Sequence, residues 1–246
     1  MLEITYPWLV GPRVPPASNT VSFAPDHPMR SMIVPRGLTA TDLDRLNSIT
    51  SSTRLVKDGT TLYRENDSFR SIYFIRAGSF KTVVRHRDGP LQVTGFYFFD
   101  DALGFEGIST MHHNCEAVAL EDSSVRIVPF LQLELLCRDV KAIQEHVHRM
   151  MSSEIARESA LMMLLGTMTA EQRLAAFLLN ISIRFKARGY SPVEFNLRMS
   201  REEIGCYLGI KLETVSRMFS EFRRKRLVDT DGKQIHILDL AGLGCI

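Results

Sequence analysis

Residues 200–222 read SREEIGCYLGIKLETVSRMFSEF, a pattern that predicts two short helices on either side of a sharp turn. Ser200 and Glu203 have the spacing of a capping box, in which each side chain accepts a hydrogen bond from the backbone N–H of the other residue. Gly209 stands where a helix commonly ends in a left-handed residue. Gly205 has no side chain, so a neighbouring helix can approach the first helix closely. Together these features predict a helix-turn-helix.

The second helix is predicted to begin near Leu212 and to have two unlike faces. One face carries apolar residues at helical spacing: Leu212, Val215, Phe219 and Phe222. The other face carries the polar residues Lys211, Glu213, Thr214, Ser216 and Arg217. Arg, Glu, Ser and Thr are side chains that contact base edges when the first turns of a helix enter the major groove. An ordinary amphipathic helix with a solvated polar side is the alternative interpretation.

Basic residues are concentrated around this second helix. The whole chain has a formal net charge of +2, whereas residues 184–233 contain 12 Lys and Arg against 7 Asp and Glu, a local excess of +5. Such an excess suits a surface that faces phosphates, as does the sequence RRKR at residues 223–226. We therefore predict double-stranded DNA as the partner, with these candidate contacts: Arg201, Lys211, Glu213, Thr214, Ser216, Arg217 and Arg223.

The composition is that of an ordinary globular protein long enough for two domains, with 246 residues of which 45% are hydrophobic and 24% charged. The first eight residues, MLEITYPW, lack the basic region and apolar core of a signal peptide. No apolar run reaches the roughly 18–20 residues of a transmembrane helix. The four cysteines are scattered without a CxxC pair, which argues against a zinc site or a disulfide framework. We expect a cytoplasmic location and no membrane partner.

Within residues 36–130, a short helix is predicted over residues 39–49, and from residue 53 to about 129 the sequence consists of short apolar or alternating runs, separated by turn signals at residues 58–59, 77–78 and 88–90. Several short strands at this spacing predict a β-sandwich or a jelly-roll β-barrel. Jelly-roll barrels commonly hold ligands, so a sensor role is consistent with this domain. Residues 1–35 contain seven of the ten prolines and no sustained periodicity, which predicts an extended arm.

Residues 131–165 contain no proline and no turn signal, and we expect a short helix followed by one long helix. One apolar line of the long helix, at Ile143, Val147 and Met150, is assigned to packing against the barrel. A second line has heptad-like spacing and is predicted to be the seam of a homodimer: His148, Met151, Ile155, Glu158, Met162 and Leu165. A helix buried on two sides within a single chain is the alternative.

Glu158 on this seam would face its symmetry mate in the dimer. Two like charges a few ångströms apart in a partly dry interface repel, which would weaken the dimer by on the order of 1 kcal/mol or more. Alternatively, the Glu158 side chain turns towards water or pairs with Arg157 of the partner subunit. The sequence leaves both interpretations open.

Residues 166–246 are predicted to form a winged helix-turn-helix. Thr169 and Gln172 have capping-box spacing and begin a helix that ends before Gly189. Residues 228–238 predict a β-hairpin wing after the second helix of the helix-turn-helix. The fold class is therefore α+β, with four predicted parts: an arm (1–35), a β-barrel (36–130), a dimerisation helix region (131–165) and a winged helix-turn-helix (166–246).

Several stretches resemble the CRP/FNR family of bacterial transcription regulators, and in particular its oxygen-responsive branch. They are SIYFIRAGSFK at 71–81, VTGFY at 93–97, LGFEGI at 103–108, EQRLAAFLLNIS at 171–182 and LGIKLETVSR at 208–217. The resemblance covers nearly the whole chain, and the last stretch is highly specific.

This resemblance implies a function and partners. Glu213, Ser216 and Arg217 would read bases in an inverted repeat of the TTGAT…ATCAA kind, bound by a homodimer. Exposed loops of the barrel and of the winged domain would contact RNA polymerase, as expected of an activator.

The oxygen-responsive branch holds a [4Fe–4S] cluster with four cysteines, which this chain lacks. Residues 1–114 contain no cysteine. In the alignment that the resemblance implies, the cysteine positions are occupied by Ala24, His27, Ile33 and Arg126. Because Ala, Ile and Arg cannot supply thiolates, we predict no cluster and no other cofactor. The chain is in this respect similar to the cluster-free FixK-type members, whose activity depends largely on expression or modification.

A second departure concerns cyclic nucleotides, which other members of the family bind inside the barrel with a Gly-Glu pair and a later Arg-Ser or Arg-Thr pair. This chain has Gly104 and Glu106, but residues 114–116 read NCE where the arginine pair is expected. A buried phosphate would have no arginine to balance its charge. We therefore predict no cyclic nucleotide.

Other functions have weaker support in the sequence. His112 and His113 suggest a cupin-like metal oxygenase, but neighbouring residues on a strand point to opposite faces and are poor joint ligands, so we do not expect an enzyme. Cys206 is either a half-buried filler, which we favour, or a thiol whose oxidation blocks DNA binding. A sensor that responds through Cys206 or an unidentified barrel ligand is thus the alternative function. We do not expect any of four histidines to bind haem, since each is more often a surface or a satisfied core residue: His27, His112, His146 and His148.

Overall fold

The computed structural model describes four stretches of the chain: residues 38–50, 52–85, 89 and 91–246. The predicted arm therefore lies outside the described residues. The chain divides into two compact units, and the boundary falls inside one long helix, between Met151 and Ser152. None of the helices in the described stretches is long and apolar enough to cross a membrane.

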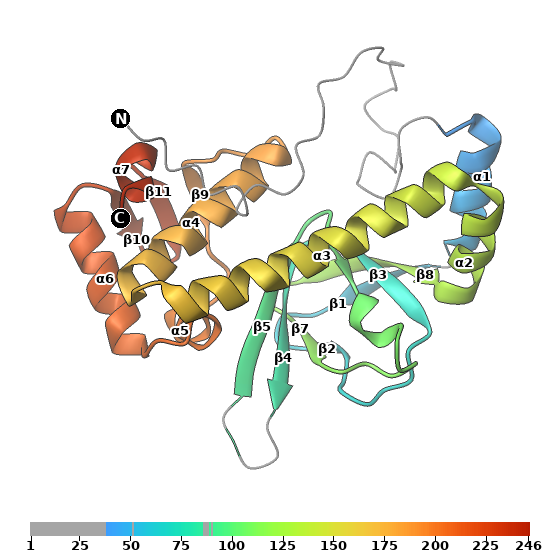
Figure 1. The fold of residues 1–246 in the computed structure, drawn as a ribbon, viewed down its shortest axis with the longest axis horizontal. Coiled ribbons are helices and arrows are strands. Elements are labelled where there is room, and N and C mark those ends of the chain that lie inside the picture. Colours follow the sequence, from blue (N-terminus) through green and yellow to red (C-terminus); the bar gives the residue numbers. More distant parts are fainter. Residues whose placement is uncertain (1–37, 51, 86–88, 90) are drawn as a thin grey trace. The chain divides into compact units, whose positions relative to one another are not determined.

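The first unit is built on eight strands in two antiparallel sheets (Figure 1). One sheet has the strand order β1-β8-β3-β6 and the other β2-β7-β4-β5, which is the jelly-roll arrangement, so the predicted β-domain is confirmed. Helix α1 precedes the strands, and the 3₁₀ helix η1 follows β6. The bounds are α1 Ala40–Ile49, β1 Ser52–Val56, β2 Thr61–Tyr63, β3 Ser71–Ala77, β4 Ser79–Arg85, β5 Leu91–Phe98, β6 Ala102–Leu103, η1 Phe105–Gly107, β7 Glu116–Ala119 and β8 Ser123–Pro129.

Two of the predicted turns contain glycines that the backbone requires. Gly59 has a φ of 71° and Gly78 a φ of 85°, in the left-handed region that L side chains rarely adopt. A side chain at Gly78 would also collide with Ser123, because its Cβ would lie 2.0 Å from the hydroxyl oxygen of that residue. The third predicted turn, at residues 88–90, lies outside the described residues except for Gly89.

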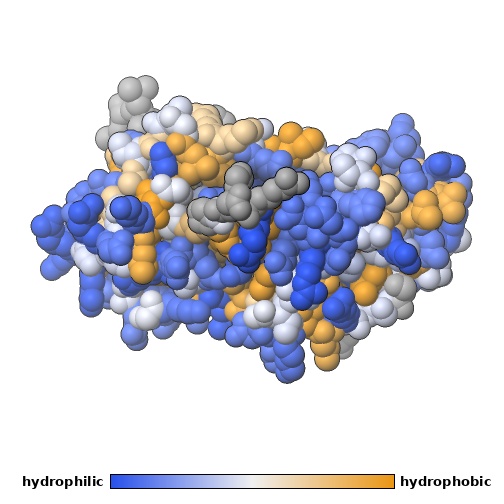
Figure 2. All heavy atoms as spheres, turned by 90° about the horizontal axis from the view of Figure 1, so that it is seen from below, coloured by the Kyte–Doolittle hydropathy of each residue, from blue (hydrophilic) through white to orange (hydrophobic). Residues whose placement is uncertain are grey.

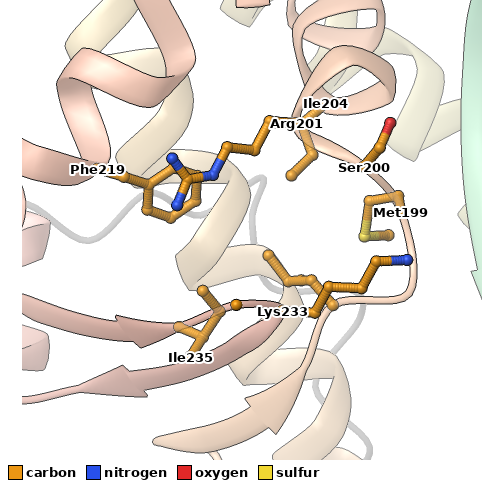
Figure 3. Close-up of a pocket in the computed structure, with 9 residues that line it drawn as sticks. Met199, Ser200, Arg201, Ile204, Phe219, Lys233 and Ile235 are labelled. Carbon is orange, nitrogen blue, oxygen red and sulfur yellow. The ribbon is translucent and has the colours of Figure 1, made fainter.

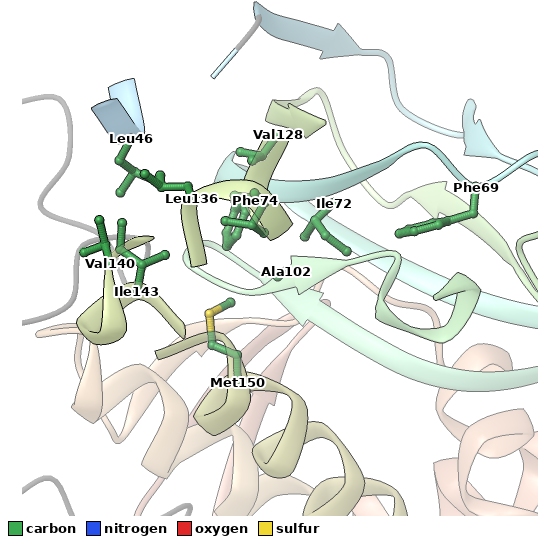
Figure 4. Packing of buried hydrophobic residues seen from close by; sticks show 11 residues of the cluster. Leu46, Phe69, Ile72, Phe74, Ala102, Val128, Leu136, Val140, Ile143 and Met150 are labelled. Atoms are coloured by element: carbon green, nitrogen blue, oxygen red, sulfur yellow. The ribbon is translucent and has the colours of Figure 1, made fainter. Parts of the chain in front are cut away.

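Two apolar clusters hold the first unit together. One lies between the sheets and contains Ile75, Phe80 and Val125 among others. The second joins the outer face of one sheet to α1, α2 (Phe130–Asp139) and the start of α3 (Lys141–Thr167), as Figure 4 shows. Its members include Leu46, Ile72, Phe74, Val128, Leu136, Val140, Ile143 and Met150, with Val147 partly buried against them. The predicted packing line of the long helix is thus confirmed.

The second unit contains the end of α3 and a winged helix-turn-helix, as predicted. A three-stranded antiparallel sheet in the order β10-β11-β9 carries the wing. Thr169 and Gln172 form the predicted capping box at the start of α4. The elements are α4 Ala170–Ala187, β9 Glu194–Asn196, α5 Arg201–Leu208, α6 Leu212–Arg224, β10 Val228–Asp231, β11 Gln234–Ile237 and α7 Leu240–Gly244.

The turn between α5 and α6 is fixed by local chemistry that the sequence predicts. Ser200 Oγ accepts from the backbone N–H of Glu203 at 3.1 Å, and Glu203 Oε2 accepts from the backbone N–H of Ser200 at 2.6 Å. Gly209 ends α5 with a φ of 63°. A Cβ on Gly205 would lie 2.6 Å from the carbonyl oxygen of Ile210, so only glycine permits this approach.

We expect Gly205→Ala to destabilise the protein by about 1–3 kcal/mol, because the added methyl group meets backbone that cannot move alone. Gly166 near the end of α3 is the matched control, since beyond its own helix no atom of the described residues lies within 4 Å of where its Cβ would be. Gly166→Ala is expected to stabilise by up to about 1 kcal/mol through helix propensity. Urea denaturation of the full chain measures both, and shifts of the same sign and size would contradict the packing argument.

Candidate nucleic-acid interface

The inner face of α6 anchors the helix to the second unit. Val215, Phe219 and Phe222 are 0%, 3% and 0% exposed. Leu212 was predicted on the same face but is 43% exposed. It lies in the first turn of α6 and at the edge of the apolar stripe, so it projects past the buried residues. The anchoring face is therefore shorter than the sequence predicts.

The outer face of α6 presents polar side chains to solvent. Lys211, Glu213 and Arg217 are exposed, and Thr214 and Ser216 are half-buried. Glutamate and arginine at i and i+4 often pair on a helix, yet Glu213 and Arg217 make no ion pair with each other or with any other described residue. Both charged groups are thus available for an outside partner.

Arg201 lies beside this surface, at the start of α5. Its guanidinium group stacks over the ring of Phe219, with 5.1 Å between Cζ and the ring centroid, an arrangement visible in Figure 3. The stacked group borders a shallow pocket of about 240 Å³ whose apolar lining includes Met199, Ile204 and Ile235. On the wing side of the pocket, Lys233 Nζ donates to the carbonyl oxygen of Arg198 at 2.6 Å. The cation–π contact holds the guanidinium group against the ring of Phe219.

The basic run at the C-terminal end of α6, residues 223–226, is only partly available for phosphates, contrary to the simple expectation from its sequence. Arg223 Nε lies 3.0 Å from Asp229 Oδ1 on the wing, and Lys225 Nζ lies 2.6 Å from Glu171 Oε1 on α4. Arg224 and Arg226 are exposed and make no ion pair within the described part of the chain. Glu171 lies 54 positions before Lys225, and Asp229 follows Arg223 across the turn into β10 rather than at a helical spacing, so the sequence pattern did not reveal either pair.

The predicted dimer seam is exposed along α3 of the single chain. Ile155 and Met162 are 64% and 68% exposed, His148 and Glu158 are exposed, and Met151 and Leu165 are half-buried. Globular proteins often expose single apolar residues, and hydrophobic residues reach the surface in separate groups on the face in Figure 2. The exposure of these side chains agrees with a dimer seam. The heptad-like spacing of the residues on α3 is the observation that indicates one.

Arg157 forms an ion pair with Glu154 one turn earlier on α3. This contact bears on Glu158, because one interpretation pairs Glu158 with Arg157 of the partner subunit. A guanidinium already held within its own chain is less suited to that role. The pairing with Arg157 is thereby less favoured, while repulsion between the two Glu158 carboxylates and a Glu158 side chain turned towards water both stay open.

Comparisons with known proteins agree with this arrangement. A Crp-like helix-turn-helix domain matches residues 172–246, and a cyclic nucleotide-binding domain matches residues 53–139. The transcriptional regulatory protein btr of Bordetella pertussis is 42% identical over 210 residues, which cover 85% of this chain and 87% of btr. The chain belongs to the CRP/FNR family. It is a DNA-binding transcription regulator and not an enzyme.

Two further relatives show how far the likeness extends. The transcriptional activator protein anr of Pseudomonas aeruginosa is 40% identical over 214 residues, 87% of this chain and 88% of its own. The solved structure of FixK2 from Bradyrhizobium japonicum aligns with a TM-score of 0.71 at 29% identity, covering 78% of this chain and 94% of FixK2. The likeness thus includes both the jelly roll and the winged helix-turn-helix of a CRP/FNR regulator.

The jelly roll of this CRP/FNR protein is filled by its own side chains around Glu106. His113 Nδ1 lies 2.8 Å from Glu106 Oε1, and the imidazole stacks on the ring of Tyr63 with 3.7 Å between centroids. His113, Tyr63 and Cys115 are 2%, 4% and 5% exposed. Burial raises the pKa of the Cys115 thiol far above its ordinary value, and the nearby Glu106 raises it further. Cys115 is therefore held as an inert thiol.

The positions that the sequence comparison assigns to a cyclic nucleotide are engaged or replaced in this interior. Glu106 is engaged with His113, and residues 114–116 supply no arginine to balance a phosphate. The structure also corrects the assumption that His112 and His113 lie on a strand. Both belong to the segment between η1 and β7, where His112 is exposed and His113 is buried, so the two imidazoles have separate environments.

The predicted absence of an iron–sulfur cluster continues to rest on the sequence. Ala24, His27 and Ile33 lie outside the described residues. Arg126, the fourth position, is 9% exposed on β8, and burial lowers the pKa of its guanidinium group. Within the described stretches, no three His, Cys, Asp or Glu residues are grouped so that they can hold a metal ion. Cys206 is half-buried on α5, and none of the four cysteines forms a disulfide.

We expect His113→Ala to destabilise the protein by about 2–4 kcal/mol, because a buried ring leaves a cavity and a carboxylate loses its partner. The control His112→Ala removes an exposed ring and should change stability by less than about 0.5 kcal/mol. Urea denaturation measures the stability of both variants, and an equal loss in the two would contradict the role assigned to His113.

The wild type is expected to bind no cyclic AMP, because the interior lacks an arginine at residues 114–116 to balance the phosphate. Calorimetric titration with cyclic AMP should therefore show no binding heat. A saturable micromolar heat would contradict the prediction that the protein binds no cyclic nucleotide.

Proposed function

We propose that the protein is a homodimeric activator that reads an inverted repeat of the TTGAT…ATCAA kind, without an iron–sulfur cluster or a cyclic nucleotide. The observation that carries this proposal is the outer face of α6, where Glu213, Ser216 and Arg217 share one surface. Charged groups that could pair with each other instead face solvent, which costs a helix its i,i+4 stabilisation. A base-reading role accounts for that cost.

The half-site chemistry matches these side chains. TTGAT contains one G·C pair, whose guanine offers two acceptors to the fork of Arg217 and whose cytosine offers an amino donor to Glu213. Ser216 lies between them on the same helix face and can hydrogen-bond to several bases. Five residues around this face are assigned to phosphates or sugar, and they fix the register of the helix in the groove: Arg201, Lys211, Thr214, Arg224 and Arg226. Arg223 would contribute only by leaving Asp229.

Dimerisation through α3 supplies the second recognition helix. An inverted repeat presents the same half-site twice with two-fold symmetry, and a two-fold dimer reproduces that symmetry. The exposed apolar residues Ile155 and Met162 lie seven positions apart, as expected for a seam of two helices. CRP/FNR regulators act as dimers, which supports this assignment.

Activation is inferred from the relatives. Anr of Pseudomonas aeruginosa and FnrA of Stutzerimonas stutzeri are transcriptional activators by name, at 40% and 39% identity. We assign this protein the same direction of action, exerted through contact between its surface loops and RNA polymerase. Transcription in vitro with purified polymerase and a promoter that carries the inverted repeat tests the direction. Reduced transcript on addition of the protein would contradict it.

Arg217→Ala is expected to lower the affinity for the inverted repeat by about 1–3 kcal/mol per half-site and to relax discrimination at the G·C pair, because the guanine loses its bidentate partner. Lys211→Ala is the matched control. A phosphate contact at Lys211 predicts equal weakening for all sequences and a shallower dependence of affinity on salt. Fluorescence anisotropy with half-site variants at fixed salt measures both, and retained G·C discrimination in Arg217→Ala would remove its assigned role.

Glu158→Ala is expected to tighten the dimer by on the order of 1 kcal/mol, because the facing carboxylates no longer repel. Met162→Glu, one turn further on the same seam, adds a second pair of like charges and should weaken the dimer. Sedimentation equilibrium over a range of concentrations gives both dissociation constants. Unchanged constants in both variants would place the dimer interface elsewhere.

A further inference from the structure

Arg173 on α4 binds three backbone carbonyl groups with one side chain. Its Nε donates to the carbonyl oxygen of Met168 at 3.0 Å, its Nη1 to that of Leu208 at 3.0 Å, and its Nη2 to that of Leu165 at 2.7 Å. All four residues belong to the second unit. The side chain is half-buried, so these hydrogen bonds are partly shielded from water.

The three carbonyl groups lie where helices end. Leu165 is in the last turn of α3, Met168 is in the α3–α4 turn, and Leu208 is the last residue of α5. Carbonyl groups in a last helical turn have no intrahelical donor and carry the negative end of the helix dipole. A guanidinium group is always charged, and its fixed planar fork donates in several directions at once. Arg173 therefore joins the C-terminal ends of α3 and α5.

The helix-turn-helix also connects α6 to the ends of α3 and α5 that Arg173 binds. Gly205 on α5 lies against both the turn and α6, because a Cβ there would be 2.6 Å from the carbonyl oxygen of Ile210 and 3.4 Å from Val215 Cγ2. A Cβ on Gly209, in the turn between them, would lie 3.4 Å from Arg173 Nη1 and 3.5 Å from Leu165 Cδ2. The turn thus packs directly on Arg173 and on the end of α3. A shift of the α3 end relative to Arg173 would move α5 and, with it, the recognition helix.

We propose that Arg173 is a positioning residue that sets the distance and phase between the two recognition helices of the dimer. This inference rests on the proposed function, because it requires two copies joined along α3. Major grooves that face the same side of a duplex recur about every 34–36 Å. A small rotation where α3 meets the helix-turn-helix moves each α6 away from its groove. Arg173 holds this junction, and its loss leaves each half-site reader intact but poorly spaced.

The inference is tested with palindromes that differ only in the separation of their half-sites. The wild type is expected to bind its preferred separation about tenfold or more tightly than duplexes one base pair longer or shorter, and Arg173→Met should reduce this preference to about threefold or less. The penalty for a base change within a half-site should be unchanged in Arg173→Met. Lys186→Met, which removes an exposed charge from the same helix, should keep the wild-type spacing preference.

Arg173→Lys provides a second variant in case Arg173→Met does not fold. Lysine keeps the charge but is a point donor without the planar fork, so its spacing preference should lie between those of the wild type and Arg173→Met. Wild-type preference in both substituted proteins, or an equal loss of affinity on every duplex, would overturn the positioning role. Absence of any spacing preference in the wild type would instead contradict the proposed dimeric function, and this inference with it.

Discussion

The close contact between α5 and α6 is the constraint on which the rest of the DNA-binding unit depends. At Gly205 an added methyl group would lie 2.6 Å from the carbonyl oxygen of Ile210 in the turn and 3.4 Å from Val215 Cγ2 on α6. Gly209 allows the reversal that brings them together, through a left-handed backbone conformation. With that contact in place, Val215, Phe219 and Phe222 bury the inner side of α6. The polar side of α6 is therefore exposed to solvent.

The charged side chains at the two ends of α6 have different surroundings. At the C-terminal end of α6, where cations complement the helix dipole, Arg223 and Lys225 bind Asp229 and Glu171 and tie α6 to the wing and to α4. At the N-terminal end, Glu213 and Arg217 remain unpaired with any other described residue. One end of the helix is thus stabilised by ion pairs, and the other keeps its charged groups for base edges. In the jelly roll, by contrast, Glu106 is already engaged by His113.

The sequence predicts most of the elements because their signals are local. The capping boxes at Ser200 and Thr169, the glycine turn and the alternating strands each depend on residues within a few positions, and the structure contains all of them. Leu212 is less buried than predicted because helical spacing alone does not show where a neighbouring element ends. The ion pair of Lys225 with Glu171 and the hydrogen bond of Arg173 to Leu208 join residues 54 and 35 positions apart, which only tertiary packing brings together, so no local pattern reveals them. The position of His113 against Tyr63 has the same origin, since a pair of adjacent histidines does not indicate which one is buried.

Two properties of the proposed dimer depend on each other. Helix α6 reads bases, and α3 pairs two copies so that both α6 helices read one site. Selection from a random duplex library by the purified protein, at a stated salt concentration, tests them together most directly. The account predicts enrichment of an inverted repeat whose half-sites contain a G·C pair and have centres about one helical turn apart. Enrichment of a single unrepeated motif, or of no motif, would contradict it.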